Sequence, residues 1–112
     1  MNKNYIRGRT KEYQAKNELE NQGYLVTRSA GSKGVYDLWA VDSRNLKLIQ
    51  LKRSKKTLTP AQLEVVFKDA IESMRGIYHL PDIAQKELWV WLDRKGWLKF
   101  RIKDDEIVQL FH

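Results

Sequence analysis

The strongest constraint on the fold is one amphipathic helix with β-strand patterns on both sides of it in the sequence. Thr59 is typical of an N-cap, Pro60 of a first helical position, and Gln62, three residues after the cap, completes a capping box. Apolar residues then recur at helical spacing until Gly76, namely Leu63, Val66, Phe67, Ala70, Ile71 and Met74. This stripe indicates a face that packs in the core rather than a binding groove.

The flanking segments favour strands. Before the helix come Tyr24–Ser29, Val35–Asp42 and Leu46–Lys52, and the last two are expected to form a hairpin. After it come Glu87–Asp93 and Trp97–Lys103. With one helix before all of these strands, the order is αβββαββ, which predicts an α/β fold with a mixed central sheet flanked by helices.

Two further expectations concern the end of the chain. In Trp97–Lys103 we expect Leu98, Phe100 and Ile102 to be buried and the alternate residues, Lys99 among them, to be solvated. The closing segment Ile107–Phe111 has no clear assignment.

The first helix is predicted to begin with Thr10 as N-cap and to run to about Gln22, where Gly23 ends it. At 100° per residue, Glu12, Ala15 and Leu19 share one face, so Glu12 points to the side that packs inward. Residues 1–9 are interpreted as a mobile basic arm.

Composition limits the possible functions. A chain of 112 residues predicts one domain, and the absence of cysteine excludes disulfides, thiolate zinc sites and thiol catalysis. There is no apolar run near 18 residues and no apolar leader with a cleavage site, so we expect neither a membrane span nor a signal peptide. A cytoplasmic location is expected, in a host cell if the encoder is a virus.

The positive charge lies in half of the chain. Residues 1–56 carry thirteen Lys and Arg against five Asp and Glu, whereas residues 57–112 carry eight against nine. Such asymmetry favours a surface for a polyanion, most often nucleic acid, over the general solubility of a small basic protein.

Polar residues interrupt one face of the apolar strand LIQLK at positions 48–52. Strand side chains alternate, so Gln50 and Lys52 share the face of Leu48. Asp37, on the partner strand of the hairpin, would meet them at the edge of the sheet.

This set can bind a divalent metal ion. The Asp37 carboxylate, the Gln50 amide oxygen and the backbone carbonyl of Leu51 supply three oxygen ligands of the kind that Mg²⁺ prefers. Lys52 can hold or deprotonate an attacking water and neutralise charge on a phosphate. Glu12 can reach the same ion directly or through water.

The sequence resembles the archaeal Holliday junction resolvases of the PD-(D/E)xK nuclease superfamily. The segment GRTKEYQAKNELENQGYLVTRSAGSKGVYDLWA has that family's glycine, helix glutamate, Gly-Tyr pair, Arg-Ser-Ala-Gly-Ser loop and Asp-Leu strand. IQLK stands where the family has Ile/Val-Glu-x-Lys, and GWLKF is similar to a later strand. Residues 8–53 match well, and beyond about residue 56 the likeness is one of layout.

The resemblance implies a single nuclease domain over residues 1–112 with a restriction-endonuclease-like core. It implies that Glu12, Asp37 and Lys52 are catalytic and that Arg28 and Ser32 are loop residues needed for cleavage. It also implies a Mg²⁺-dependent homodimer, with Mn²⁺ as a substitute, that resolves four-way DNA junctions by paired nicks. The residues expected to contact phosphates are Arg7, Arg9, Arg28, Lys33, Arg53, Lys55 and Lys56.

Three positions depart from the family pattern. Gln50 replaces a glutamate, Tyr13 stands where an arginine is expected, and one extra residue separates Ser32 from Asp37. The neutral amide removes one negative charge, which should lower metal affinity by about an order of magnitude.

The same residues also fit other interpretations. Singly, Asp37, Gln50 and Lys52 also fit the solvated face of an edge strand, and the loop AGSKG at residues 30–34 also fits a simple turn. At the level of function, the alternatives are a repair or phage-type nuclease acting on other branched or single-stranded DNA, and a catalytically weakened protein that binds junctions.

Overall fold

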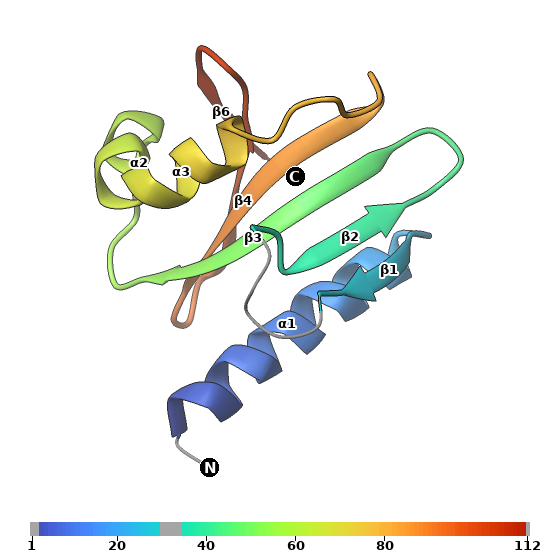
Figure 1. Ribbon diagram of the computed structural model, residues 1–112. Helices are drawn as coiled ribbons and strands as arrows, with labels where there is room; N and C mark the ends of the chain where they lie inside the picture. The colour runs from blue at the N-terminus through green and yellow to red at the C-terminus, as the bar shows by residue number, and fades with distance from the viewer. Residues whose placement is uncertain (1–2, 30–34, 112) are drawn as a thin grey trace.

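A six-stranded mixed sheet forms the centre of the computed structural model, which describes residues 3–29 and 35–111, with side chains from residue 10 onward (Figure 1). The strands lie in the order of the sequence from β1 to β6. The elements are α1 (Lys3–Asn21), β1 (Leu25–Arg28), β2 (Leu38–Val41), β3 (Leu46–Ser54), α2 (Pro60–Val66), α3 (Lys68–Arg75), β4 (Ala84–Leu92), β5 (Gly96–Ile102) and β6 (Ile107–Leu110).

Only β3 and β4 pair in parallel among the described strands, and every other neighbouring pair is antiparallel. Parallel neighbours need a long crossover, which α2 and α3 provide. The previously unassigned segment at the C-terminal end forms β6, which pairs with β5. The predicted α/β class and mixed sheet are therefore confirmed.

The helices cover opposite faces of the sheet, and each face has its own apolar cluster. On one face, Leu19 of α1 packs with Ile49 and Trp89. On the other, Ile71 of α3 packs with Leu48. This arrangement places Leu48, and with it the face shared by Gln50 and Lys52, on the side of α2 and α3.

The helix that follows Thr59 is divided in two, whereas the sequence pattern predicted one continuous helix. The predicted capping box is present: Thr59 Oγ1 accepts from the Gln62 N–H at 3.2 Å, and Gln62 Oε1 accepts from the Thr59 N–H at 2.9 Å. The break falls at Phe67, whose φ of −114° and ψ of 37° are not helical. Val66, expected in the core, is 55% exposed at the end of α2.

The first helix begins earlier than predicted. It starts at Lys3, so the N-cap assigned to Thr10 is wrong. Residues 3–9, which were interpreted as part of a mobile basic arm, belong to α1. Gly8 lies inside α1, and one glycine inside a helix costs only about 1 kcal/mol, so it does not end the helix. The inward face was predicted correctly, because Ala15 and Leu19 are fully buried.

Several charged side chains lie between α1 and the sheet. Lys99, expected in solvent, is 5% exposed because α1 covers that face of β5, and its ammonium pairs with Glu18. Glu87 is fully buried; its Oε2 lies 3.1 Å from Lys47 Nζ, and its Oε1 accepts from the Trp89 Nε1–H at 2.9 Å.

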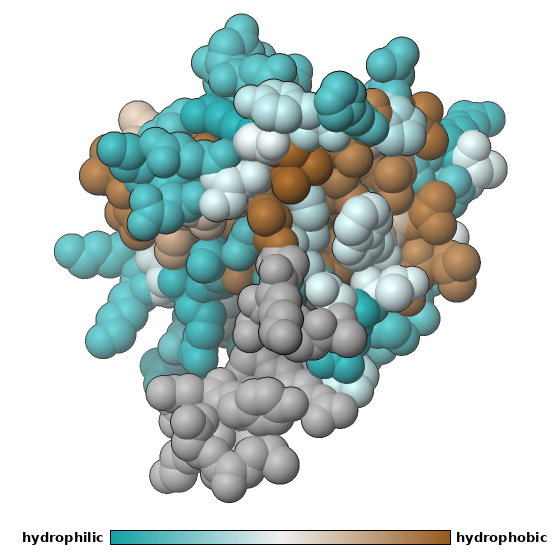
Figure 2. All heavy atoms as spheres, viewed as in Figure 1, coloured by the Kyte–Doolittle hydropathy of each residue, from teal (hydrophilic) through white to brown (hydrophobic). Residues whose placement is uncertain are grey.

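The outer strands leave an apolar strip on the surface. Leu25, Trp39 and Val41 are 72%, 44% and 39% exposed. They lie on the face of β1 and β2 opposite α1, in a part of the sheet that α2 and α3 do not reach. Figure 2 shows apolar side chains reaching the surface over these strands. Within the part of the chain that the structure describes, no helix is long and apolar enough to cross a bilayer.

Candidate active site

A cavity of about 130 Å³ lies where α1 meets the ends of several strands. Four of the predicted catalytic and metal-binding residues line it: Glu12 from α1, Asp37 from the segment before β2, and Leu51 and Lys52 from β3. Lys11, Arg53 and Trp97 complete the lining. Residues far apart in the sequence therefore converge at one site.

Asp37 occupies the point at which β2 and β3 begin to diverge. The regular ladder reaches the pair Leu38 and Ile49, and beyond it the Asp37 N–H still donates to the Ile49 carbonyl at 2.9 Å. The next donor, the Leu51 N–H, is bound at 2.8 Å by the side-chain Oδ2 of Asp37. On its other side, the Asp37 carbonyl accepts from the Ser29 N–H at 2.9 Å. These bonds orient the Asp37 carboxylate toward β3.

The surroundings of Asp37 disfavour its negative charge. Burial raises the pKa of Asp37, and the nearby Glu12 carboxylate raises it further. The Leu51 N–H and the Lys52 ammonium act in the opposite direction but do not cancel the effect. A cation bound near Asp37 and Glu12 would relieve this cost, so the pair favours a cation ligand.

Lys52 and Gln50 are both half-buried, but they are placed differently. Lys52 lines the cavity, and it also borders a second hollow of about 230 Å³ beside α2 and α3. Gln50 pairs in register with Leu88 of β4 and is not among the described residues that line the cavity. The structure thus brings Lys52, but not the Gln50 side chain, to the cavity wall.

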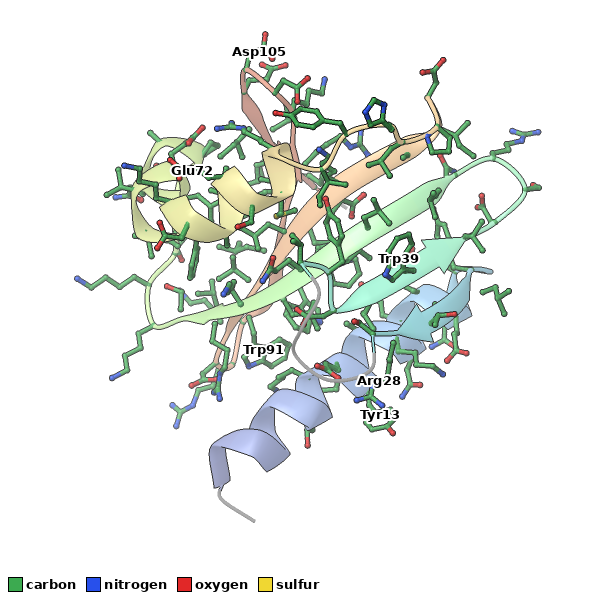
Figure 3. All side chains as sticks on the ribbon, viewed as in Figure 1. Tyr13, Arg28, Trp39, Glu72, Trp91 and Asp105 are labelled. Carbon is green, nitrogen blue, oxygen red and sulfur yellow. The ribbon has the colours of Figure 1, made fainter. Side chains whose placement is uncertain are left out.

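Glu12 forms an ion pair with Arg28, the last residue of β1. Its Oε2 accepts from Arg28 Nη2 at 2.6 Å and from Arg28 Nε at 3.1 Å. Tyr13 supports the same guanidinium, because its hydroxyl accepts from Nη1 at 3.2 Å and its ring centroid lies 4.5 Å away. Figure 3 shows Tyr13 and Arg28 side by side. In this structure Arg28, which was predicted to contact phosphate, holds the Glu12 carboxylate.

The sequence did not single out Lys11, although it lines the cavity. Its Nζ lies 3.6 Å from the centroid of a Trp91 ring and donates to Gln14 Oε1 at 3.1 Å. Burial lowers the pKa of Lys11, and the neighbouring Arg53 charge lowers it further, while Asp93 acts against both. The only signal in the sequence was its position next to Glu12, since Trp91 is eighty residues away.

The other predicted phosphate contacts are only partly described. Arg53 donates from Nη2 to Asp93 Oδ1 at 3.1 Å, and Lys55 and Lys56 are exposed just after β3. Ser32 and Lys33 lie outside the described residues. The backbone of Arg7 and Arg9 is part of α1, but their side chains lie outside the described part of the structure.

The oxygen donors at the cavity fit a hard divalent ion that keeps much of its water. The described residues contain no group of three or more His, Cys, Asp or Glu that could hold a metal. Two carboxylates, Asp37 and Glu12, line the cavity. Burial raises the pKa of Asp37, and the Glu12 charge raises it further, so a bound cation would stabilise the ionised carboxylate. At about 30 Å³ per water, the cavity has room for an ion with a few waters.

Comparison with known proteins gives a match at the level of the fold. No protein-family model and no curated protein sequence matches the chain. Among solved structures, the Holliday junction resolvase Hjc of the archaeal hyperthermophile Archaeoglobus fulgidus is similar, with a TM-score of 0.56 and 20% sequence identity over 93% of this chain and 83% of the resolvase chain. The chain therefore has the restriction-endonuclease-like fold of that resolvase.

Proposed function

We propose that this protein is a metal-dependent endonuclease that acts on branched DNA, most specifically on four-way junctions. The observation that carries the proposal is the convergence of Glu12, Asp37 and Lys52, from three separate segments of the chain, on one cavity in a fold similar to that of a Holliday junction resolvase. The basic N-terminal half of the chain supports a polyanionic substrate.

In the proposed mechanism, Asp37 would be the principal metal ligand. The Leu51 backbone carbonyl and the Gln50 amide would add neutral oxygens, and Glu12, held by Arg28, would act through water. When bound, Mg²⁺ or Mn²⁺ would supply a Lewis acid that activates water and neutralises phosphate charge. Gln50 and Lys52 are half-buried and lie two residues apart on one face of β3.

Lys52 has the central role among the protein's own groups. Its ammonium lines the cavity beside Asp37 and can orient the attacking water and stabilise negative charge on the phosphate. Arg53, Lys55 and Lys56 follow it and can hold the DNA backbone without reading its sequence. Arg7, Arg9 and Lys33 are proposed to do the same.

We also propose that the active form is a homodimer, because paired symmetric nicks need two sites related by two-fold symmetry. The exposed apolar strip of Leu25, Trp39 and Val41 supports this proposal, since it offers surface for a second copy. Light scattering coupled to size exclusion gives the mass in solution, and a monomer at micromolar concentration would count against the dimer.

Cleavage of a substrate panel tests the function. A synthetic four-way junction is incubated with Mg²⁺ or Mn²⁺ beside linear duplex, flap and single-strand controls. Paired symmetric nicks in the junction alone are expected. Cleavage of flaps or single strands without cleavage of the junction would instead establish the repair or phage-type nuclease.

A second candidate, a junction-binding protein with weakened catalysis, is favoured by specific features of the site. Arg28 already neutralises Glu12, Gln50 is uncharged, and three cations line the cavity against two carboxylates. Tight junction binding by the folded protein, with no cutting in either metal, would establish this candidate.

A further inference from the structure

A second cationic group adjoins the cavity, and most of it has no role in the proposed mechanism. Lys11 and Arg53 line the cavity, and Trp91 and Asp93 hold them in place. Asp93 Oδ1 accepts from Arg53 Nη2 at 3.1 Å and from the Trp91 Nε1–H at 3.1 Å. One carboxylate therefore fixes both the guanidinium of Arg53 and the indole that lies against Lys11.

This group is anchored to the core of the protein. The Trp91 and Trp97 ring centroids are 5.1 Å apart in an edge-to-face contact, and Trp97 in turn lies 5.7 Å from Trp89, which is 1% exposed. Figure 3 shows Trp91 at the end of the sheet that meets α1. The Trp91 ring, which lies against Lys11, is therefore held by packing against the core, whereas Lys11 itself belongs to α1.

The charges at the cavity are suited to an anion in addition to a metal. Lys11, Lys52 and Arg53 line it against Glu12 and Asp37, and Glu12 already has its own partner in Arg28. The carboxylate that holds Arg53 belongs to Asp93, whose side chain is 72% exposed. Exposed ion pairs are weak, so a phosphate can compete with Asp93 for Arg53.

We propose that Lys11 and Arg53 form a second phosphate subsite, which binds a phosphodiester next to the one that is cleaved. Trp91 is the platform that positions Lys11, and Asp93 is an internal anion that the DNA phosphate displaces. This inference rests on the proposed function, because it requires a DNA strand in the cavity.

The salt dependence of binding tests the subsite. A fluorescent four-way junction is titrated in EDTA at several salt concentrations with wild type, Lys11→Gln and Lys16→Gln. Lys16 is the matched control, since it lies on the same helix and pairs with Glu20 at 3.0 Å instead of lining the cavity. Loss of one phosphate contact should reduce the slope of log K against log salt by about 0.9 in Lys11→Gln only. Equal slopes for wild type and Lys11→Gln overturn the proposal.

Two further variants test the supporting residues. Asp93→Asn keeps an acceptor for the Trp91 N–H but removes the competing charge, so junction affinity should rise by about 1.5- to 5-fold, the usual worth of an exposed ion pair. Trp91→Leu should reproduce the reduced slope of Lys11→Gln, while Trp91→Phe, which keeps an aromatic face, should not. Weaker binding by folded Asp93→Asn overturns the displacement.

Cleavage is assayed separately in Mg²⁺ with the same protein variants, so the phosphate subsite and the nuclease function can fail independently. Cleavage with unchanged salt slopes overturns the subsite alone, and a changed slope without any cleavage overturns the nuclease function alone. Wild type that binds no DNA overturns both.

Discussion

Removing Lys47 should strongly destabilise the protein, because the buried carboxylate of Glu87 then loses its nearest cation. The Glu87 side chain is fully buried. In Lys47→Met its Oε1 still accepts from the Trp89 N–H at 2.9 Å. The only cation left near its Oε2 among the described residues is Arg101, at 3.8 Å. Breaking a buried pair by removing one partner costs about 3–5 kcal/mol. Since Arg101 remains, we expect about 2–4 kcal/mol, or a fall in Tm of about 8–16 °C at about 4 °C per kcal/mol.

Glu87→Gln should cost less, about 1 kcal/mol, because it keeps an acceptor for Trp89 and the Lys47 side chain is 16% exposed and can reach water. The double variant should then be more stable than the sum of the two single changes predicts, by about 1–2 kcal/mol. Urea unfolding followed by circular dichroism measures all four proteins. Lys103→Met is the control, since its pair with Glu106 is exposed. The reasoning is refuted if Lys47→Met is no more destabilising than this control.

Further predictions concern the site and the second helix. Burial and Glu12 raise the folded-state pKa of Asp37 above its unfolded value, so the ionised carboxylate lowers the free energy of unfolding at neutral pH. This destabilisation decreases as the pH falls through the raised pKa, and it is gone below about 3.9, the ordinary pKa of Asp. Asp37→Asn should therefore have a higher Tm than wild type at pH 7, with the difference shrinking on acidification; a lower Tm at pH 7 contradicts this. Gln50→Glu should reduce the Mg²⁺ concentration needed for half-maximal cleavage by about tenfold, and an unchanged requirement would argue that Gln50 is not a ligand. Thr59→Ala should lower the free energy of unfolding by about 1 kcal/mol through loss of the helix cap, and no change in urea unfolding would show that the capping box contributes little.

Local signals in the sequence accounted for most of the fold. The capping box of Thr59 and Gln62 and the alternation in the strands depend on neighbours within a few residues, and the structure contains both. The hairpin order was enough to bring Asp37 beside Leu51 and Lys52. These features could be predicted from the sequence because each depends on the spacing of residues along the chain.

The remaining features depend on contacts between distant elements. Lys99 is buried because α1 lies across β5, and alternation within one strand does not reveal which faces are covered. Arg28 meets Glu12 across the interface of β1 with α1, and Lys11 meets Trp91 across the interface of α1 with β4. The sequence could propose the members of the site but not the partners that neutralise or position them.

The most direct test of the central claim compares cleavage and binding by wild type, Asp37→Asn and Lys52→Ala on one four-way junction. Asp42→Asn, in the turn between β2 and β3, is the control for loss of a carboxylate outside the cavity. We predict that wild type and Asp42→Asn make paired nicks in Mg²⁺, whereas both site variants bind the junction with similar affinity and do not cut. Undiminished cleavage by both Asp37→Asn and Lys52→Ala would contradict the assignment of this cavity as the active site.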